Sequence, residues 1–172
     1  EVRGVMTLVG SARLWTDDRV ALPTPLQAAL DDFAARGRSV MIVRHGEAWL
    51  GVLGLLDPPR SSVPATLDRL RALHLSPLVM LTGDHAGVGD AIGREVGVDE
   101  VRADLLPEDK VVAIHALMAA HGTVVMVGDG VNDAPALAAS TVGIAMGGAG
   151  TAAALETADA ALMGDDLARL PW

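Results

Sequence analysis

Residues 128–133 place three oxygen-bearing side chains directly after an apolar run. The run 123–127 is followed by Gly-Asp-Gly-Val-Asn-Asp, so that Asp129, Asn132 and Asp133 fall within five positions. Glycines alternating with acids after a buried strand are hard to explain by solubility alone. Carboxylate and amide oxygens are the ligands of hard cations such as Mg²⁺. This segment is therefore the strongest candidate site in the sequence.

A hydroxyl, a glycine and a carboxylate follow a second apolar run, 77–81, as Thr82, Gly83 and Asp84. Turn chemistry alone also explains these three residue types. Lys110 lies in the expected first turn of a helix, where it can neutralise a phosphoryl group, although most lysines are simply exposed. A cation, a hydroxyl and several carboxylates at one place suit phosphoryl transfer with Mg²⁺.

The elements that must bring these groups together read as a parallel sheet with crossover helices. Short apolar runs alternate with helical patterns from residue 77 onward, which is typical of this architecture. Ligands bind at the carboxyl ends of such strands. The expected strands are 77–81, 123–127, 142–145 and 158–162, and the expected helices are 63–73, 86–97 and 107–121.

The first fifty residues have a different pattern, which predicts a small α+β segment. Strands are expected at 5–9, 39–43 and 48–56, with a helix at 25–36. Asp57-Pro58-Pro59-Arg60 then breaks the pattern, because consecutive prolines remove two backbone donors and fix φ. We place a domain boundary there, between residues 1–56 and residues 57–172.

Composition excludes several classes of protein. A formal net charge of −9 argues against a nucleic-acid partner. The absence of cysteine removes disulfides, zinc ribbons and thiol nucleophiles, and it suits a cytosolic setting. Two uncharged stretches, 111–128 and 134–155, contain histidine, proline or several glycines, so neither reads as a membrane span. We expect a soluble chain.

Three motifs in this order resemble the phosphorylation domain of P-type ATPases. They are Thr82-Gly83-Asp84, then residues 106–110 (Leu-Pro-Glu-Asp-Lys), then residues 128–137 (Gly-Asp-Gly-Val-Asn-Asp-Ala-Pro-Ala-Leu). Asp57-Pro58-Pro59-Arg60 resembles the family's hinge. Residues 101–106, 142–147 and 156–159 resemble the heavy-metal-transporting branch, and residues 1–50 resemble the last part of its nucleotide-binding domain, less specifically.

The resemblance implies an α/β fold of the haloacid dehalogenase-like, or Rossmann-like, type after a partial nucleotide-binding segment. Thr82 would hold phosphate oxygens beside Gly83, Lys110 would neutralise the phosphoryl group, and Asp84 and Arg60 would lie on the nucleotide side. Asp129 would bind Mg²⁺, and Asn132 and Asp133 would orient the metal and the acceptor. ATP, the rest of the pump and a heavy-metal cation are the implied partners, with the parent protein in the plasma membrane.

One departure from the family pattern bears on the fold. The acceptor motif Asp-Lys-Thr-Gly-Thr does not occur in the 172 residues, and neither does the Ser-Glu-His-Pro segment. The acceptor strand of such a sheet lies between the strands ending at Leu81 and Val127. We therefore expect that these two strands pair directly, or that a strand from residues 1–56, most plausibly 48–56, fills the gap, because a buried strand needs its backbone paired. A chain that does neither should aggregate or dimerise through this seam.

Three functions remain open from the sequence. The first is a cytosolic fragment of an ATP-driven heavy-metal pump, which would be inactive alone. The second is a stand-alone phosphatase of the same fold, which needs an Asp-x-Asp nucleophile that Asp17-Asp18 and Asp31-Asp32 do not supply. The third is a non-catalytic nucleotide-binding or Mg²⁺-binding module.

Overall fold

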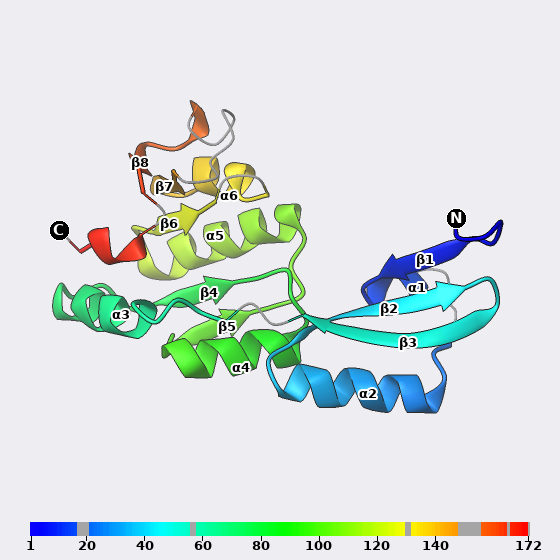
Figure 1. Ribbon diagram of the computed structural model, residues 1–172. Coiled ribbons are helices and arrows are strands. Elements are labelled where there is room, and N and C mark those ends of the chain that lie inside the picture. The colour runs from blue at the N-terminus through cyan, green and yellow to red at the C-terminus, as the bar shows by residue number, and fades with distance from the viewer. Residues whose placement is uncertain (17–20, 56–57, 130–131, 148–155, 165, 172) are drawn as a thin grey trace.

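The structure is a computed structural model that describes residues 1–16, 21–55, 58–129, 132–147, 156–164 and 166–171. Its strands form three separate sheets, in the orders β1-β2-β3, β4-β5 and β6-β7-β8. The first sheet and helix α2 lie on one side of the molecule, and the other two sheets with their helices lie on the opposite side (Figure 1). Asp57, part of the expected boundary, falls outside the described residues.

The N-terminal unit, which we define as residues 1–55, is an antiparallel sheet packed against one long helix. The strands β1 (Thr7–Gly10), β2 (Ser39–His45) and β3 (Ala48–Leu55) form a meander in which β2 is central. Helix α2 (Thr24–Ala35) covers one face, and a short helix α1 spans Arg13–Thr16. Trp15, Leu30 and Ile42 form the core, and Trp15 meets Trp49 edge to face at 4.9 Å. This aromatic and aliphatic packing supplies the apolar burial that a small three-stranded sheet needs for stability.

The remainder begins with α3 (Val63–Ala72) and the parallel pair β4 (Val79–Leu81) and β5 (Glu100–Arg102). Helix α4 (Ala86–Val96) connects these strands and packs closely on β5. A Cβ atom on Gly93 would overlap the side chain of Val101, so glycine is what allows this approach. Glycine lowers the stability of a helix, and here that loss is offset by the close packing of α4 on β5, which a larger residue would prevent.

The second parallel sheet contains β6 (Val125–Gly128), β7 (Val142–Met146) and β8 (Ala160–Leu162). Helix α5 (Pro107–His121) precedes β6, α6 (Ala134–Ala139) links β6 to β7, and the 3₁₀ turn η1 spans Leu167–Arg169. Ile114, Met126, Ala136 and Leu137 form the buried cluster that holds α5 and α6 on this sheet.

The mixed α/β architecture with parallel strands and crossover helices confirms the fold class predicted from the sequence. The ranges agree to within a few residues. Strand β5 was not expected, because Glu100-Val101-Arg102 contains one apolar residue between two charged ones. Its neighbours supply the reason for the strand: β4 binds it by backbone hydrogen bonds, and α4 packs against the half-buried Val101.

Neither predicted way of closing the gap between β4 and β6 within the chain is found, and association of chains through this seam stays a prediction. Within the described residues β4 pairs with β5, β6 pairs with β7, and β3 pairs with β2. Side-chain packing holds the two parallel sheets together instead, since Leu81 of β4 packs against the cluster around Ile114 and α3 contacts η1. The backbone of β3 pairs with β2, and β3 lies in the N-terminal unit, away from the gap (Figure 1).

Among the described residues, no helix combines the length and the apolar character that crossing a bilayer requires.

The start of β4 is held by an ionised carboxylate, which gives the fold a pH dependence. Asp99 accepts the Leu78 N–H at 2.7 Å and an Arg71 N–H at 2.8 Å. The Leu78 N–H first, and then Arg71, hold the pKa of Asp99 below its ordinary value. A lowered pKa contributes stability above the unfolded-state value, and that stability is lost as the pH falls through the folded value.

We expect Asp99→Asn to lower the free energy of unfolding at pH 7 and to reduce its further loss below about pH 4. Urea unfolding across this pH range measures both effects. Asp31→Asn, on an exposed part of α2, is the matched control, and it keeps the wild-type acid dependence because both contacts of Asp99 remain. An identical acid profile in the Asp99 variant would contradict the assignment.

Candidate functional site

Thr82, Gly83 and Asp84 form a hydrogen-bonded turn at the carboxyl end of β4. The Thr82 hydroxyl donates to Asp84 Oδ2 at 3.1 Å and accepts the Asp84 N–H at 3.1 Å. Gly83 is exposed, whereas Thr82 and Asp84 are half-buried. The three residues thus present a hydroxyl and a carboxylate in a fixed relation at the strand end.

Backbone bonds to the segment after β5 hold this turn in place. Thr82 N–H donates to the Arg102 carbonyl, and the carbonyls of Thr82 and Asp84 accept from Leu105 at 3.1 Å and Asp104 at 2.8 Å. The carboxylate of Asp104 accepts the Ala86 N–H at 3.0 Å, at the start of α4. The ends of β4 and β5 therefore form one unit, as expected for neighbouring parallel strands.

Lys110 and Asp133 meet across the ends of α5 and β6. Their side chains form an ion pair of 2.6 Å, and only 13% and 15% of the two side chains are exposed. Lys110 lies in the first turn of α5 because Pro107 begins the helix and Asp109 Oδ2 accepts the Leu106 N–H. An ion pair this well shielded from water is stronger than the surface pairs of the chain.

Gly128 makes room for the carboxylate of Asp133 at the end of β6. A Cβ atom on residue 128 would lie 2.7 Å from Asp133 Oδ2 and 2.8 Å from its Cβ. The segment can therefore fold Asp133 back against the strand end only if residue 128 lacks a side chain. This accounts for the glycine that opens the acidic motif.

The other predicted site residues lie on the surface. Asp129 and Asn132 are exposed beside Asp133, at the end of β6 and the start of α6. The side chain of Arg60 is exposed, and the Arg60 carbonyl accepts the Val63 N–H at the start of α3. Gly130 and Val131 lie outside the described residues. The structure thus joins Lys110 to Asp133 and Thr82 to Asp84 as two half-sites.

The contact between Ser39 and Asp84 was not predicted from the sequence. The Ser39 hydroxyl donates to Asp84 Oδ1 at 2.9 Å, from the first residue of β2 in the N-terminal unit. Both oxygens of Asp84 are therefore engaged, one by Ser39 and one by Thr82. A serine that begins a strand belongs to no recognisable motif, so no sequence signal marks this role.

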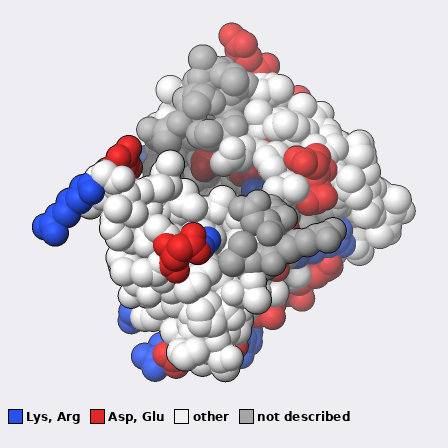
Figure 2. Space-filling view, turned by 90° about the vertical axis from the view of Figure 1, so that its right-hand side faces the viewer, with Lys and Arg blue, Asp and Glu red and all other residues white. Residues whose placement is uncertain are grey.

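Acidic side chains are visible on the face of the molecule shown in Figure 2. In the upper half of Figure 2, acidic side chains lie in a hollow with a smaller basic patch beside them. Within the described part of the chain, no group of three or more His, Cys, Asp or Glu residues could hold a metal ion. Asp129 and Asp133 nevertheless fit Mg²⁺, which needs one or two carboxylates and completes its shell with water and phosphate oxygens.

Comparison with known families places most of the chain in one group. A family model described as haloacid dehalogenase-like hydrolase matches residues 4–141. A probable cadmium-transporting ATPase of Staphylococcus aureus (strain MRSA252) is 44% identical over 99% of this chain. A manganese-exporting P-type ATPase of Mycobacterium tuberculosis (strain ATCC 25618 / H37Rv) is 41% identical over 97% of it. The chain spans 24% and 23% of these two relatives.

Solved structures show the same similarity. A zinc-transporting PIB-type ATPase in its E2.Pi state superposes with a TM-score of 0.67 and 40% identity, over 99% of this chain and 26% of its own. The catalytic domain CopB-B of a CPx-ATPase superposes with a TM-score of 0.63 at 30% identity, over 76% of this chain and 52% of its own. The predicted resemblance to heavy-metal-transporting P-type ATPases and the predicted haloacid dehalogenase-like fold are both confirmed.

The Lys110–Asp133 pair yields a test by substitution. We expect Lys110→Met to lower the free energy of unfolding by about 1–3 kcal/mol, because it leaves the Asp133 carboxylate shielded and without its cation. Adding Asp133→Asn should recover part of this loss, since it removes the unpaired charge. Chemical denaturation of the single and double variants measures the coupling.

The exposed pair of Arg36 and Asp32, whose side chains are 61% and 55% exposed, supplies the matched control. Arg36→Met should change stability by less than about 1 kcal/mol. Equal losses of unfolding free energy in the Lys110 and Arg36 variants would show that the shielded pair contributes no more to stability than the exposed one.

Proposed function

We propose, since the chain belongs to the haloacid dehalogenase-like hydrolase family, that it supplies the phosphate-binding and Mg²⁺-binding part of a phosphoryl-transfer site in a heavy-metal-transporting P-type ATPase. The observation that carries this proposal is the shielded Lys110–Asp133 pair at the end of β6. Positioning and charge neutralisation are what phosphoryl transfer asks of a protein. A lysine held by a carboxylate in the first turn of a helix provides both.

Each half-site has a distinct task in this proposal. The Thr82 hydroxyl binds a phosphate oxygen by donating its single proton to it in place of Asp84, while it still accepts the Asp84 N–H. Lys110 neutralises the transferring group from its fixed place beside Asp133. Asp129 and Asp133 would hold Mg²⁺, which supplies charge neutralisation on the phosphate oxygens, and Asn132 orients the acceptor.

The covalent step requires a group that these 172 residues do not provide in the expected motif. An oxygen of an acceptor carboxylate forms a bond to the γ-phosphorus of ATP, and the bond from that phosphorus to the bridging oxygen breaks as ADP leaves. We infer that the acceptor comes from another part of the pump. The chain alone then has the means to bind phosphate but nothing that receives it.

Residues 1–56 are, in this proposal, the last part of a nucleotide-binding domain, and residues 57–172 are the phosphorylation domain. Arg60, between them, and Asp84 lie on the ATP side. The relatives are described as cadmium-transporting and manganese-exporting, and a structural neighbour as zinc-transporting. A divalent heavy-metal cation is accordingly the proposed cargo of the parent protein, which would lie in the plasma membrane with this part in the cytosol.

Mg²⁺ binding tests the metal half of the proposal. We expect Mg²⁺ titration to shift the amide NMR signals of residues 128–133, and Asp129→Asn to weaken binding by about tenfold, because it removes one of two hard oxygen ligands. Asp31→Asn, on the exposed face of α2, should leave the affinity unchanged. Shifts centred on other residues, or binding that Asp129→Asn does not alter, would refute the assignment.

Phosphoryl transfer by the isolated chain should be absent. Incubation with radiolabelled ATP and Mg²⁺, followed by an acid quench, is expected to leave no covalent label, because the acceptor carboxylate is missing. A full-length metal-transporting ATPase serves as the positive control. A label that hydroxylamine removes would mean that another carboxylate of this chain accepts the phosphoryl group.

A further inference from the structure

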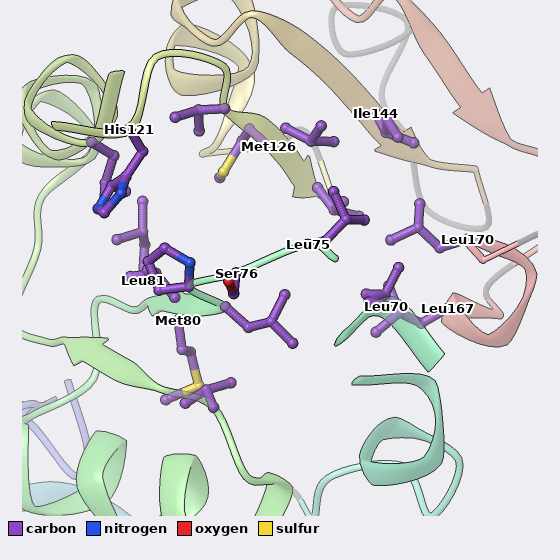
Figure 3. A pocket seen from close by; sticks show the side chains of 18 of the residues that line it. Leu70, Leu75, Ser76, Met80, Leu81, His121, Met126, Ile144, Leu167 and Leu170 are labelled. Carbon is purple, nitrogen blue, oxygen red and sulfur yellow. The ribbon is translucent and has the colours of Figure 1, made fainter. Parts of the chain in front are cut away.

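The Thr82–Asp84 turn has protein contacts on two of its sides. The carboxyl end of β4 points toward the N-terminal unit (Figure 1), and backbone bonds to the segment after β5 hold one side of the turn. On the side of β6, an apolar cavity of about 740 Å³ separates the sheets, lined by Met80, Leu81 and Met126 (Figure 3). Within the described residues β4 pairs only with β5, so the second support of the turn comes from the N-terminal unit.

Ser39 provides this second support through the carboxylate of Asp84. The Ser39 hydroxyl donates to Asp84 Oδ1 at 2.9 Å, and both residues are half-buried. Ser39 begins β2 and pairs with Leu55 of β3, so the sheet fixes the position of its backbone. Helix α2 also packs on α4, where a Cβ atom on Gly87 would lie 3.4 Å from the Cβ of Ala34. The N-terminal unit therefore presents the Ser39 hydroxyl to Asp84 from a packed interface.

The hydrogen bonds around Asp84 depend on a fixed number of protons. A carboxylate only accepts hydrogen bonds, and each hydroxyl donates a single proton. Ser39 and Thr82 both donate to Asp84, one to each of its oxygens. A phosphate oxygen that binds the Thr82 hydroxyl must take this proton away from Asp84, because the hydroxyl has no second one. Phosphate and the Asp84 carboxylate therefore compete for one proton.

Ser39 favours phosphate in this competition. A hydrogen bond to one oxygen of a carboxylate polarises the whole group, so that the other oxygen attracts its own donor less strongly. With Ser39 in place, the carboxylate of Asp84 also keeps one donor after Thr82 has turned to phosphate. Without Ser39, the same exchange would leave a half-buried carboxylate with no hydrogen bond from the described part of the chain. Leaving such an acceptor unsatisfied lowers stability, and here it would oppose phosphate binding.

We propose that Ser39 is a positioning residue of the phosphate site and that it acts through Asp84. Ser39 fixes the carboxylate of Asp84 and supplies the donor that allows Thr82 to give its proton to a phosphate oxygen. The role of phosphate in this inference rests on the proposed function. The control of the Asp84 carboxylate by Ser39 rests on the two hydrogen bonds and requires no ligand.

The first measurement uses the chain without any ligand. Scalar couplings between the Hα and Hβ protons of Asp84, measured by NMR, report the rotamer of its side chain. We expect the couplings of one staggered rotamer in the unchanged chain and in Ser39→Thr, which keeps the hydroxyl. Ser39→Ala should give averaged couplings, because the carboxylate loses one of its two donors. Averaged couplings in the unchanged chain, or a single rotamer in Ser39→Ala, would overturn the proposal.

The second measurement titrates inorganic phosphate, without Mg²⁺ or nucleotide, and follows the amide NMR signals of the Thr82–Asp84 turn. We expect Ser39→Ala to raise the dissociation constant by about fivefold, because binding then leaves the carboxylate without a donor. Ser39→Thr should keep the wild-type affinity to within about twofold, because its hydroxyl supplies the same donor. Ser11→Ala, the same substitution at an exposed serine of the N-terminal unit, should leave the affinity unchanged. Equal affinities for the two alanine variants would overturn the proposal.

A double-mutant cycle tests whether Ser39 acts through Asp84. Asp84→Ala removes the acceptor that Ser39 and Thr82 share. In this background, Ser39→Ala should have no further effect on the dissociation constant of phosphate. A loss of affinity that persists in the double variant would show that Ser39 acts by another route, and it would overturn the proposal.

Two further outcomes distinguish positioning from simple attachment of the N-terminal unit, and from the proposed function. The amide signals of Ala34 and Ala91, which lie in the contact between this unit and α4, should not move in Ser39→Ala. Shifts there together with a loss of affinity would assign Ser39 to holding the two units together and overturn the proposal. Absence of phosphate binding to the unchanged chain would refute the phosphate part of the proposed function. The control of Asp84 by Ser39 would then still be supported if the couplings change as expected.

Discussion

The backbone of a strand must bind another strand or water on each of its edges, and this requirement governs the whole chain. In the N-terminal meander, β2 is paired with a strand on both edges, whereas the outer strands β1 and β3 are each paired on one within the described residues. Strands β4 and β6 are likewise paired on one edge each. The two parallel sheets are therefore held together by side chains, chiefly the cluster around Ile114 and Leu81, rather than by a continuous ladder.

This division explains why the site consists of two half-sites. The turn Thr82–Asp84 is fixed by backbone bonds to the segment after β5, so it belongs to the β4–β5 sheet. Lys110 and Asp133 are fixed by the start of α5 and the close approach of Asp133 to Gly128, so they belong to the β6 sheet. Each half-site is thus tied by its contacts to its own sheet.

The sequence predicted the features that arise from local chemistry. Pro107 and Asp109 predict the start of α5, and the apolar run before Gly128 predicts β6 and the acidic turn after it. Strand β5 was missed because its one apolar residue, Val101, finds its packing partner only through tertiary contact with α4. The open gap was missed for a related reason: the sequence shows that an apolar edge needs covering, but side-chain packing across the gap appears only in three dimensions. The Ser39–Asp84 bond joins residues 45 positions apart, which no local pattern encodes.

That bond makes Asp84 a mechanical connection between the two halves of the molecule. The carboxylate holds Ser39 of the N-terminal unit with one oxygen and the Thr82 hydroxyl with the other. A rotation of the N-terminal unit that withdraws Ser39 frees one acceptor oxygen and allows the carboxylate to turn. Because the Thr82 hydroxyl donates to that same carboxylate, its direction changes with the rotation. A change in the orientation of the N-terminal unit that broke the Ser39 contact would therefore alter the surroundings of the hydroxyl at the end of β4.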